Sequence, residues 1–168
     1  MKSKLLVLAA MGVMAVLVAG CGGGGGGSDS SNIKGRFREI QKGLENKDIQ
    51  RVMSVYSFNF LDNGYYFDDI KNGTANLFID FNNIQEDQSF RDISIQGNFA
   101  YVTWTETITG LEVSTGLTKQ SVTTYDDVLH WEHGDWYLYG NQKSAAPGVK
   151  KTLRYSGQRM REAPVKPR

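Results

Sequence analysis

The stretch that decides the fold is residues 123–142, TTYDDVLHWEHGDWYLYGNQ. It predicts two β-strands rich in Tyr, Trp, Val and Leu, joined by a tight turn at His133, Gly134 and Asp135. Both strands carry bulky side chains on both faces, and such strands gain most from burial in the middle of a packed sheet. We therefore expect an antiparallel hairpin at the centre of the sheet, covered by the elements that precede it in the chain.

Helical periodicity dominates the chain before residue 90. Asn32 can cap a first helix with a single apolar stripe, which comprises Ile33, Phe37, Ile40 and Leu44. Asp48 can cap a second, short helix. A third helix is expected at about residues 74–83, and a start as early as Phe67 stays open. We expect these helices to cover a sheet built by the rest of the chain.

The period changes from helical to strand-like after residue 90. Residues 91–96 alternate, Gly97 and Asn98 form a tight turn, and residues 99–109 make a long strand of Thr, Val, Tyr and Trp. A short loop bounded by glycines then leads into the hairpin. Helices followed by a meander of antiparallel strands predict an α+β fold, in which the helices cover one face of a curved sheet.

Four segments together resemble the nuclear transport factor 2-like superfamily. They are residues 44–48 (LENKD), residues 56–61 (YSFNFL), residues 97–102 (GNFAYV) and residues 134–136 (GDW). The resemblance covers residues 33–143 and implies a cone-shaped domain with a pocket between helices and sheet. The superfamily includes ketosteroid isomerase, polyketide cyclases of the SnoaL type, scytalone dehydratase and many binding or scaffold domains. The resemblance therefore supports a fold and leaves the function open.

The resemblance to ketosteroid isomerases assigns a tyrosine, a base and an acid to the pocket. The tyrosine position is Ile40 here, and the base position falls near Asp62 with an offset. The acid on a late strand matches Asp127. By strand alternation Asp127 shares a face with apolar and aromatic side chains, where desolvation disfavours a charged carboxylate, as a general acid requires. The alternative is that Asp127 lies at a strand end, solvated or hydrogen-bonded to a tyrosine.

The aromatic side chains of the strands can form plain core or line an amphipathic pocket, and both interpretations stay open. The candidate binding residues are Tyr56, Asp62, Tyr101, Tyr125, Trp131 and Tyr139. Alternation places on the opposite face Ala100, Val102, Trp104, Val128, Trp136 and Leu138. Because that face is too apolar to remain in water, we expect a second copy of the chain, in a homodimer, or the carboxyl-terminal tail to cover it.

A metal centre and a cofactor are not expected. On a strand, His130 and His133 point to opposite faces, so they cannot bind one ion together. The sequence also contains no nucleophile elbow, phosphate-binding loop or helical His-Glu-x-x-His motif.

The amino terminus resembles a bacterial lipoprotein signal. Lys2 and Lys4 precede an apolar run, and small residues lead to Cys21, the only cysteine. We expect residues 1–20 to be a signal peptide, Cys21 to be lipidated, and residues 21–32 to form a flexible Gly/Ser tether. The domain would then be anchored to a membrane of the bacterial cell envelope, the outer membrane facing the periplasm in a Gram-negative organism.

Charge divides the chain into an acidic and a basic part. Residues 22–142 hold 9 basic and 17 acidic side chains, whereas residues 143–168 hold 8 basic and 1 acidic. Residues 144–168 are predicted to be a basic tail, either solvated or attracted to anionic lipid headgroups or cell-wall polymers. Nucleic acid is not expected as the partner of an exported lipoprotein.

Two functional hypotheses stay open. The first is a non-catalytic domain at an envelope membrane that holds a small amphipathic ligand or an envelope protein. The second is a small acid–base enzyme of the isomerase, dehydratase or cyclase kind that uses Asp127. An open pocket with a second polar group beside Asp127 would favour the enzyme, whereas a pocket filled by its own side chains would favour a scaffold.

Overall fold

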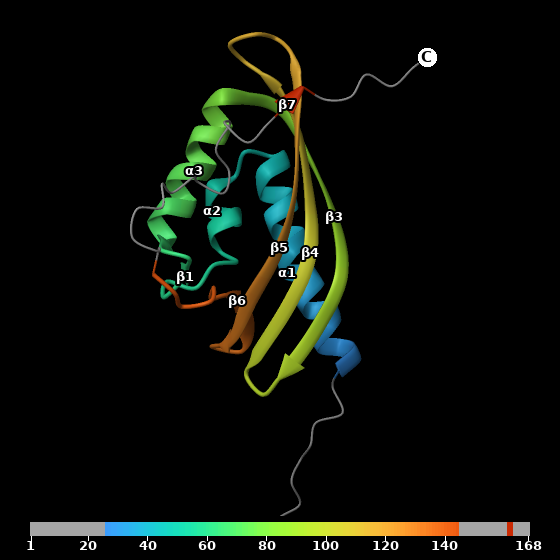
Figure 1. Cartoon of the computed structure of the whole chain (residues 1–168), viewed down its shortest axis with the longest axis vertical. Helices are drawn as coiled ribbons and strands as arrows, with labels where there is room; N and C mark the ends of the chain where they lie inside the picture. Colours follow the sequence, from blue (N-terminus) through green and yellow to red (C-terminus); the bar gives the residue numbers. More distant parts are fainter. Residues whose placement is uncertain (1–25, 145–160, 163–168) are drawn as a thin grey trace, which may run out of the picture.

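The computed structural model describes residues 26–144 and 161–162 (Figure 1). The helices are α1 (Gly26–Glu45), α2 (Ile49–Met53) and α3 (Phe67–Asp80). The strands are β1 (Leu61–Asp62), β2 (Tyr65–Tyr66), β3 (Phe81–Gln96), β4 (Phe99–Glu112), β5 (Thr118–Glu132), β6 (Asp135–Leu138) and β7 (Arg161–Glu162). Helices precede the long strands in the chain, so the predicted α+β class is confirmed.

The long strands form one antiparallel sheet in the order β3-β4-β5-β6, and β7 pairs with β5. A separate two-stranded piece joins β1 to β2. Figure 1 shows the sheet curling, with the helices on its concave side. The strand expected at residues 91–96 begins ten residues earlier, at Phe81. Register shifts between Asn82 and Gln85 and between Phe90 and Asp92 interrupt the pairing of β3, and such bulges let a long strand bend with the sheet.

The helices form where their apolar stripes predict them. The stripe of α1 is fully buried and comprises Ile33, Phe37, Ile40 and Leu44. The helix begins at Gly26, so residues 26–32, which we expected in the tether, are helical. Asp48 caps α2 by accepting a hydrogen bond from the backbone N–H of Arg51 at 3.0 Å. The third helix has the earlier of its two expected starts, Phe67.

The turn of the deciding hairpin consists of His133 and Gly134, with φ angles of 50° and 87°. Both residues therefore adopt the left-handed conformation that a two-residue hairpin favours. The hairpin as a whole lies at one end of the strand order, not at its centre. Its outer strand is still not an open edge, because Leu138 exchanges backbone hydrogen bonds of 2.9 Å with Val55 and Ser57. This pairing explains the bulky side chains on both faces of β6.

The residues of neighbouring strands that share a face differ from our expectation. Trp104 is paired with Tyr125, and Val102 with Asp127, so these side chains share one face. That face lies under the helices, and its buried apolar members include Ala100, Val102, Trp104, Leu129, Trp136 and Leu138. We had placed all of these except Leu129 on the outer face, together with Val128. The predicted alternation of side chains within each strand is confirmed. The sequence alone does not determine the register between neighbouring strands, which decides which of their side chains share a face.

The outer face of the sheet is mostly polar. Thr103 donates a hydrogen bond to Asp126 at 2.7 Å, and the hydroxyls of Thr105 and Thr124 lie 2.9 Å apart. Apolar side chains gather at one end of this face, where Phe99, Tyr101, Val128 and Tyr139 line a shallow pocket. Among the residues described, no helix is long and apolar enough to cross a membrane. Cys21 and residues 1–25 lie outside the described residues, as does most of the basic tail.

Candidate functional site

Two glutamates are buried on the inner face of the sheet. Glu106 follows Trp104 by two positions on β4 and therefore points the same way, towards the helices. Glu86 on β3 pairs with Ile108, the next inward residue of β4. The exposed fraction is 1% for Glu86 and 2% for Glu106. Carboxyl groups are rarely buried to this extent without a partner, so the pair needs an explanation.

Neighbouring polar groups hold both carboxyl groups in place. The side-chain amide of Gln88 donates to Glu86 Oε1 at 2.8 Å and to the backbone carbonyl of Phe37 on α1 at 2.7 Å. The hydroxyl of Tyr125 donates to Glu106 Oε2 at 3.1 Å. Gln41 on α1 donates to the backbone carbonyl of Glu86 at 2.6 Å. The pair therefore belongs to a network that joins β3, β4 and β5 to the first helix.

The two carboxyl groups cannot both be charged at low cost. Burial, the charge of Glu106 and a hydrogen bond shared with Glu106 together raise the pKa of Glu86 to about 9, while the hydrogen bond from Gln88 acts in the opposite direction. At neutral pH Glu86 thus keeps its proton. A protonated carboxyl group is a hydrogen-bond donor, whereas a carboxylate is an acceptor only. The network can therefore offer a donor and an acceptor side by side.

Asp127 extends this network along β5. Its exposed fraction is 6%, and its Oδ2 accepts a hydrogen bond from Trp104 Nε1 at 2.7 Å. The ring of Trp104 lies 5.3 Å, centroid to centroid, from that of Tyr125, which binds Glu106. Asp127, Trp104, Tyr125, Glu106 and Glu86 therefore form a continuous line of polar and aromatic groups on the inner face. We call this line the inner polar row.

The structure brings together only some of the residues predicted for the site. Tyr125 and Asp127 belong to the inner polar row. Tyr101 and Tyr139 lie instead on the outer face, where both line the shallow pocket. The prediction that they share a concave face with Tyr125 is therefore wrong. In the observed register between the strands, the residues that share a face with Tyr125 are the ones next to Tyr101 and Tyr139 in sequence.

The other predicted residues lie around the ends of the strands. Tyr56 is 2% exposed and packs edge-on against Phe60 with 5.1 Å between ring centroids. Asp62 accepts a hydrogen bond from the backbone N–H of Asn141 at 3.2 Å, a bond that ties β1 to the chain after β6. Trp131 is 37% exposed and contacts Trp136 edge-on at 5.3 Å.

Sequence reasoning missed Glu86, Gln88 and Glu106. For Glu106 a signal was present, since residues 103–109 read TWTETIT and alternation puts Glu106 on the face of Trp104 and Ile108. For Glu86 no comparable signal exists. Residues 81–90 show no clear alternation, and the bulge after Asn82 shifts their phase.

A cleft lies at the carboxyl end of β5, where the loop after α2 meets the β5–β6 hairpin. We call it the hairpin cleft; its volume is about 390 Å³, and its lining includes Met53, Tyr56, Ser57, Phe58, Glu132 and Tyr137. Ser57 Oγ donates to both carboxylate oxygens of Glu132 at 3.1 Å, and His130 Nδ1 lies 3.1 Å from Glu132 Oε1. Within the described part of the chain, no group of His, Cys, Asp and Glu is arranged to hold a metal ion.

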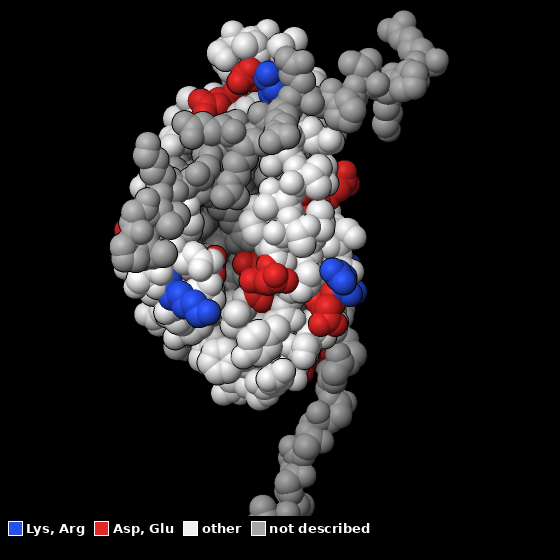
Figure 2. Space-filling view, viewed as in Figure 1, with Lys and Arg blue, Asp and Glu red and all other residues white. Residues whose placement is uncertain are grey.

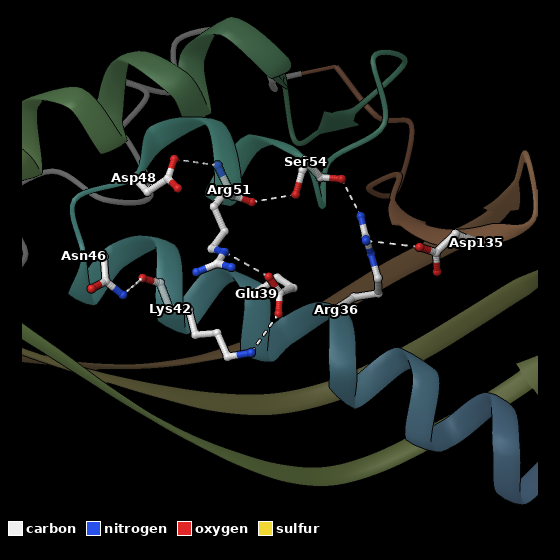
Figure 3. Close-up of polar contacts among 8 residues, drawn as sticks. All are labelled: Arg36, Glu39, Lys42, Asn46, Asp48, Arg51, Ser54 and Asp135. Atoms are coloured by element: carbon white, nitrogen blue, oxygen red, sulfur yellow. Dashed lines mark hydrogen bonds and ion pairs between the residues drawn. The ribbon is translucent and has the colours of Figure 1, made fainter.

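Ion pairs fix the helices beside this cleft (Figure 3). Arg36 on α1 pairs with Asp135 of the hairpin at 3.1 Å and donates to the backbone carbonyl of Ser54 after α2. Glu39 on α1 pairs with Arg51 of α2 at 3.0 Å. Gly43 allows α1 and α2 to approach closely, because a Cβ atom there would lie 2.6 Å from a methyl group of Val52. The walls of the cleft are thus held by three elements.

The surface between the helices and the sheet is hollowed in the view of Figure 2, with acidic side chains beside the hollow. Basic side chains are sparse on the described part of this face. The view agrees with the excess of acidic over basic residues in residues 22–142. The described part of this face therefore carries more acidic than basic side chains.

No protein-family model and no curated protein matches the sequence. Solved structures do match. A candidate scytalone dehydratase from Novosphingobium aromaticivorans superposes with a TM-score of 0.63 and 11% identity, over 68% of this chain and 82% of that chain. A candidate dehydratase of the nuclear transport factor 2-like family from Streptomyces avermitilis gives 0.58 and 15%, over 71% and 98%.

A nuclear transport factor 2-like superfamily protein from Salmonella enterica serovar Typhimurium gives a TM-score of 0.60 and 13% identity, over 76% of this chain and 99% of that chain. Identities this low carry information about the fold and not about the reaction. The curled antiparallel sheet, the helices on its concave side and these superpositions agree with one another. The protein therefore has the nuclear transport factor 2-like cone fold that the sequence resembles.

Proposed function

We propose that the domain binds a small amphipathic molecule inside the cone, against the inner polar row. The observation that carries the proposal is the buried pair of Glu86 and Glu106. Two carboxyl groups in a low-dielectric interior cost stability that apolar residues of similar size would not. Perturbed carboxyl groups of this kind cluster at functional sites, because recognition and catalysis use them.

The chemistry of the inner polar row defines the class of ligand. The protonated carboxyl group of Glu86 can donate to a carbonyl or ether oxygen, and the carboxylate of Glu106 can accept from a hydroxyl group. The rings of Phe37 and Trp104, whose centroids are 4.7 Å apart, are buried nearby and make the surroundings apolar. A largely apolar ligand with a neutral polar group matches this arrangement, and an anionic ligand does not.

Native mass spectrometry of the purified full-length protein tests the proposal. We expect a co-purified small molecule that is retained by the wild type and lost from Glu86→Gln and Glu106→Gln. Glu112→Gln, at the end of β4, is the matched control, because it makes the same chemical change on a residue outside the row. Retention of the same ligand by all three variants would refute the role of the acid pair.

Acid–base catalysis is the second candidate function. A proton-holding Glu86 beside Glu106 can give and take protons, and Asp127 is buried with Trp104 Nε1 as a second polar group within hydrogen-bond reach. Two of the similar structures are candidate dehydratases. Incubating the recovered ligand with fresh protein separates the candidates. An enzyme converts the ligand to a product of different mass or isomeric form, whereas a binding domain returns it unchanged.

We also propose that the domain is anchored in a bacterial envelope through a lipidated Cys21. The support is the basic start, the apolar run and the small residues that lead to the cysteine. Labelling cells with a fatty-acid analogue should mark the wild type and not Cys21→Ser. Equal labelling of the two would refute the anchor.

A further inference from the structure

The hairpin cleft has the features of a ligand site that is separate from the inner polar row. Its volume, about 390 Å³, lies within the range of small-molecule pockets. Its lining combines aromatic and apolar side chains, including Tyr56, Phe58 and Tyr137, with polar ones. Phe58 is 89% exposed, although its ring lies 5.2 Å, centroid to centroid, from that of Phe67. An aromatic side chain left in water at the rim of a cleft gains burial when a ligand binds.

The carboxylate of Glu132 makes the cleft suited to a cation. Glu132 is held by Ser57 and His130, and its side chain is 19% exposed. No Lys or Arg is paired with Glu132 among the residues that the structure describes. The nearby guanidinium of Arg36 is neutralised by Asp135 at 3.1 Å. Among the described residues that line the cleft, Glu132 is the only carboxylate and none is Lys or Arg.

Tyr137, one of the aromatic residues that line the cleft, already contacts a cationic side chain. The guanidinium of Arg36 lies 5.0 Å from the centroid of the Tyr137 ring. Rings in such positions attract ammonium groups through their quadrupole, and the attraction increases as the site loses water. Ser57 is 2% exposed and presents its hydroxyl to both oxygens of Glu132, which fixes the orientation of the carboxylate before any ligand arrives.

From these contacts we infer that the hairpin cleft binds a small primary ammonium compound with an apolar body. The ammonium group pairs with Glu132, and the apolar body packs against Tyr56, Phe58 and Met53. The site is independent of the ligand proposed for the inner polar row, since no residue of that row lines the cleft.

Titration of the full-length protein with phenethylamine tests the inference, with 2-phenylethanol as the neutral probe of similar shape. Ligand-observed NMR or calorimetry should show phenethylamine binding at least about tenfold more tightly than the alcohol, because only the amine forms the charge pair. Glu132→Gln should weaken amine binding by about tenfold and leave alcohol binding nearly unchanged. Phe58→Ala should weaken both probes by about threefold or more.

Control variants keep the result interpretable. Because Phe58 is largely exposed, its replacement should leave the fold intact, and circular dichroism can check the fold of both Phe58→Ala and Glu132→Gln. Glu112→Gln, at the end of β4 and outside both proposed sites, should bind phenethylamine like the wild type. Equal affinity for amine and alcohol, no binding of the amine, or amine binding that Glu132→Gln leaves unchanged would each overturn the inference.

Discussion

The two faces of the sheet make the same kinds of hydrogen bond in different surroundings. On the outer face Thr103 donates to Asp126 at 2.7 Å, and both groups are open to water. On the inner face Trp104 donates to Asp127, also at 2.7 Å, and both are buried. Asp126 and Asp127 are neighbours in sequence and identical in chemistry. Their difference shows that the face of the sheet on which an acidic side chain lies, and not its residue type, decides whether it can belong to a buried site.

The contrast continues along the strands. Outward positions of β4 carry threonines that water can satisfy, so losing one of their hydrogen bonds has little cost. Inward positions carry Trp104, Glu106 and Ile108, all of which are buried. Replacing an inner group therefore either leaves a cavity or an unpaired polar atom, or relieves a buried charge. Three comparisons of inner with outer residues, and one change confined to the outer face, test this difference.

The largest effect is expected from Trp104→Ala. Trp104 is fully buried and its ring packs against Phe37, Phe90 and Tyr125, so the change should lower the free energy of unfolding by about 3–5 kcal/mol. Tyr101→Ala on the outer face of the same strand should cost less than about 1 kcal/mol. Urea denaturation measures both. Similar losses for the two variants would contradict the assignment of the faces.

The next effect concerns the pH dependence contributed by Glu86. Its pKa is raised from 4.5 to about 9 in the folded protein, so folding takes up a proton between those values. The stability that this group contributes is fully present below pH 4.5 and is lost as the pH rises towards about 9.

In the wild type, Glu86 should therefore lower the free energy of unfolding by up to about 1.4 kcal/mol for each pH unit in that window, and Glu86→Gln should remove this decrease. The variant should become more stable than the wild type as the pH rises, which urea denaturation at about pH 5, 7 and 8.5 can follow. Asp126→Asn on the outer face is the control and should not change the slope. A wild type and a Glu86→Gln variant with parallel pH profiles would show that Glu86 titrates normally.

A smaller effect separates the neighbouring aspartates. Asp127→Ala leaves the buried Nε1 of Trp104 without its acceptor, which should cost about 1–3 kcal/mol. Asp127→Asn keeps an acceptor oxygen and should cost less. Asp126→Ala should change the free energy of unfolding by less than about 0.5 kcal/mol, because water replaces the lost bond to Thr103. Equal costs at the two positions would mean that Asp127 is solvated.

The smallest effect on stability is expected at the apolar end of the outer face. A homodimer through Trp104, Trp136 and Leu138, as first expected, is excluded because these residues are buried under the helices. We predict that a homodimer uses Phe99, Tyr101 and Val128 instead. Tyr101→Arg should then convert a dimer to a monomer in sedimentation velocity, with little change in unfolding. A wild type that sediments as a monomer would end the dimer hypothesis.

Local patterns alone were enough to predict much of the fold. The stripe of α1, the Asp48 cap of α2 and the turn at His133 and Gly134 all involve residues close in sequence. Such features depend on backbone geometry within a few residues, so they hold whatever the rest of the chain does. The order of helices and strands then restricted the architecture to an α+β fold.

The sequence by itself determined the elements, their order and the inward or outward alternation within each strand. Only the tertiary structure decided which alternate set faces the helices, because the register between β4, β5 and β6 depends on side-chain packing across strands. It also decided that Glu86 meets Glu106, which are twenty positions apart and are joined by the pairing of β3 with β4 across a bulge. A buried carboxyl pair exists only where two strands bring its members together, so no single stretch of sequence contains it.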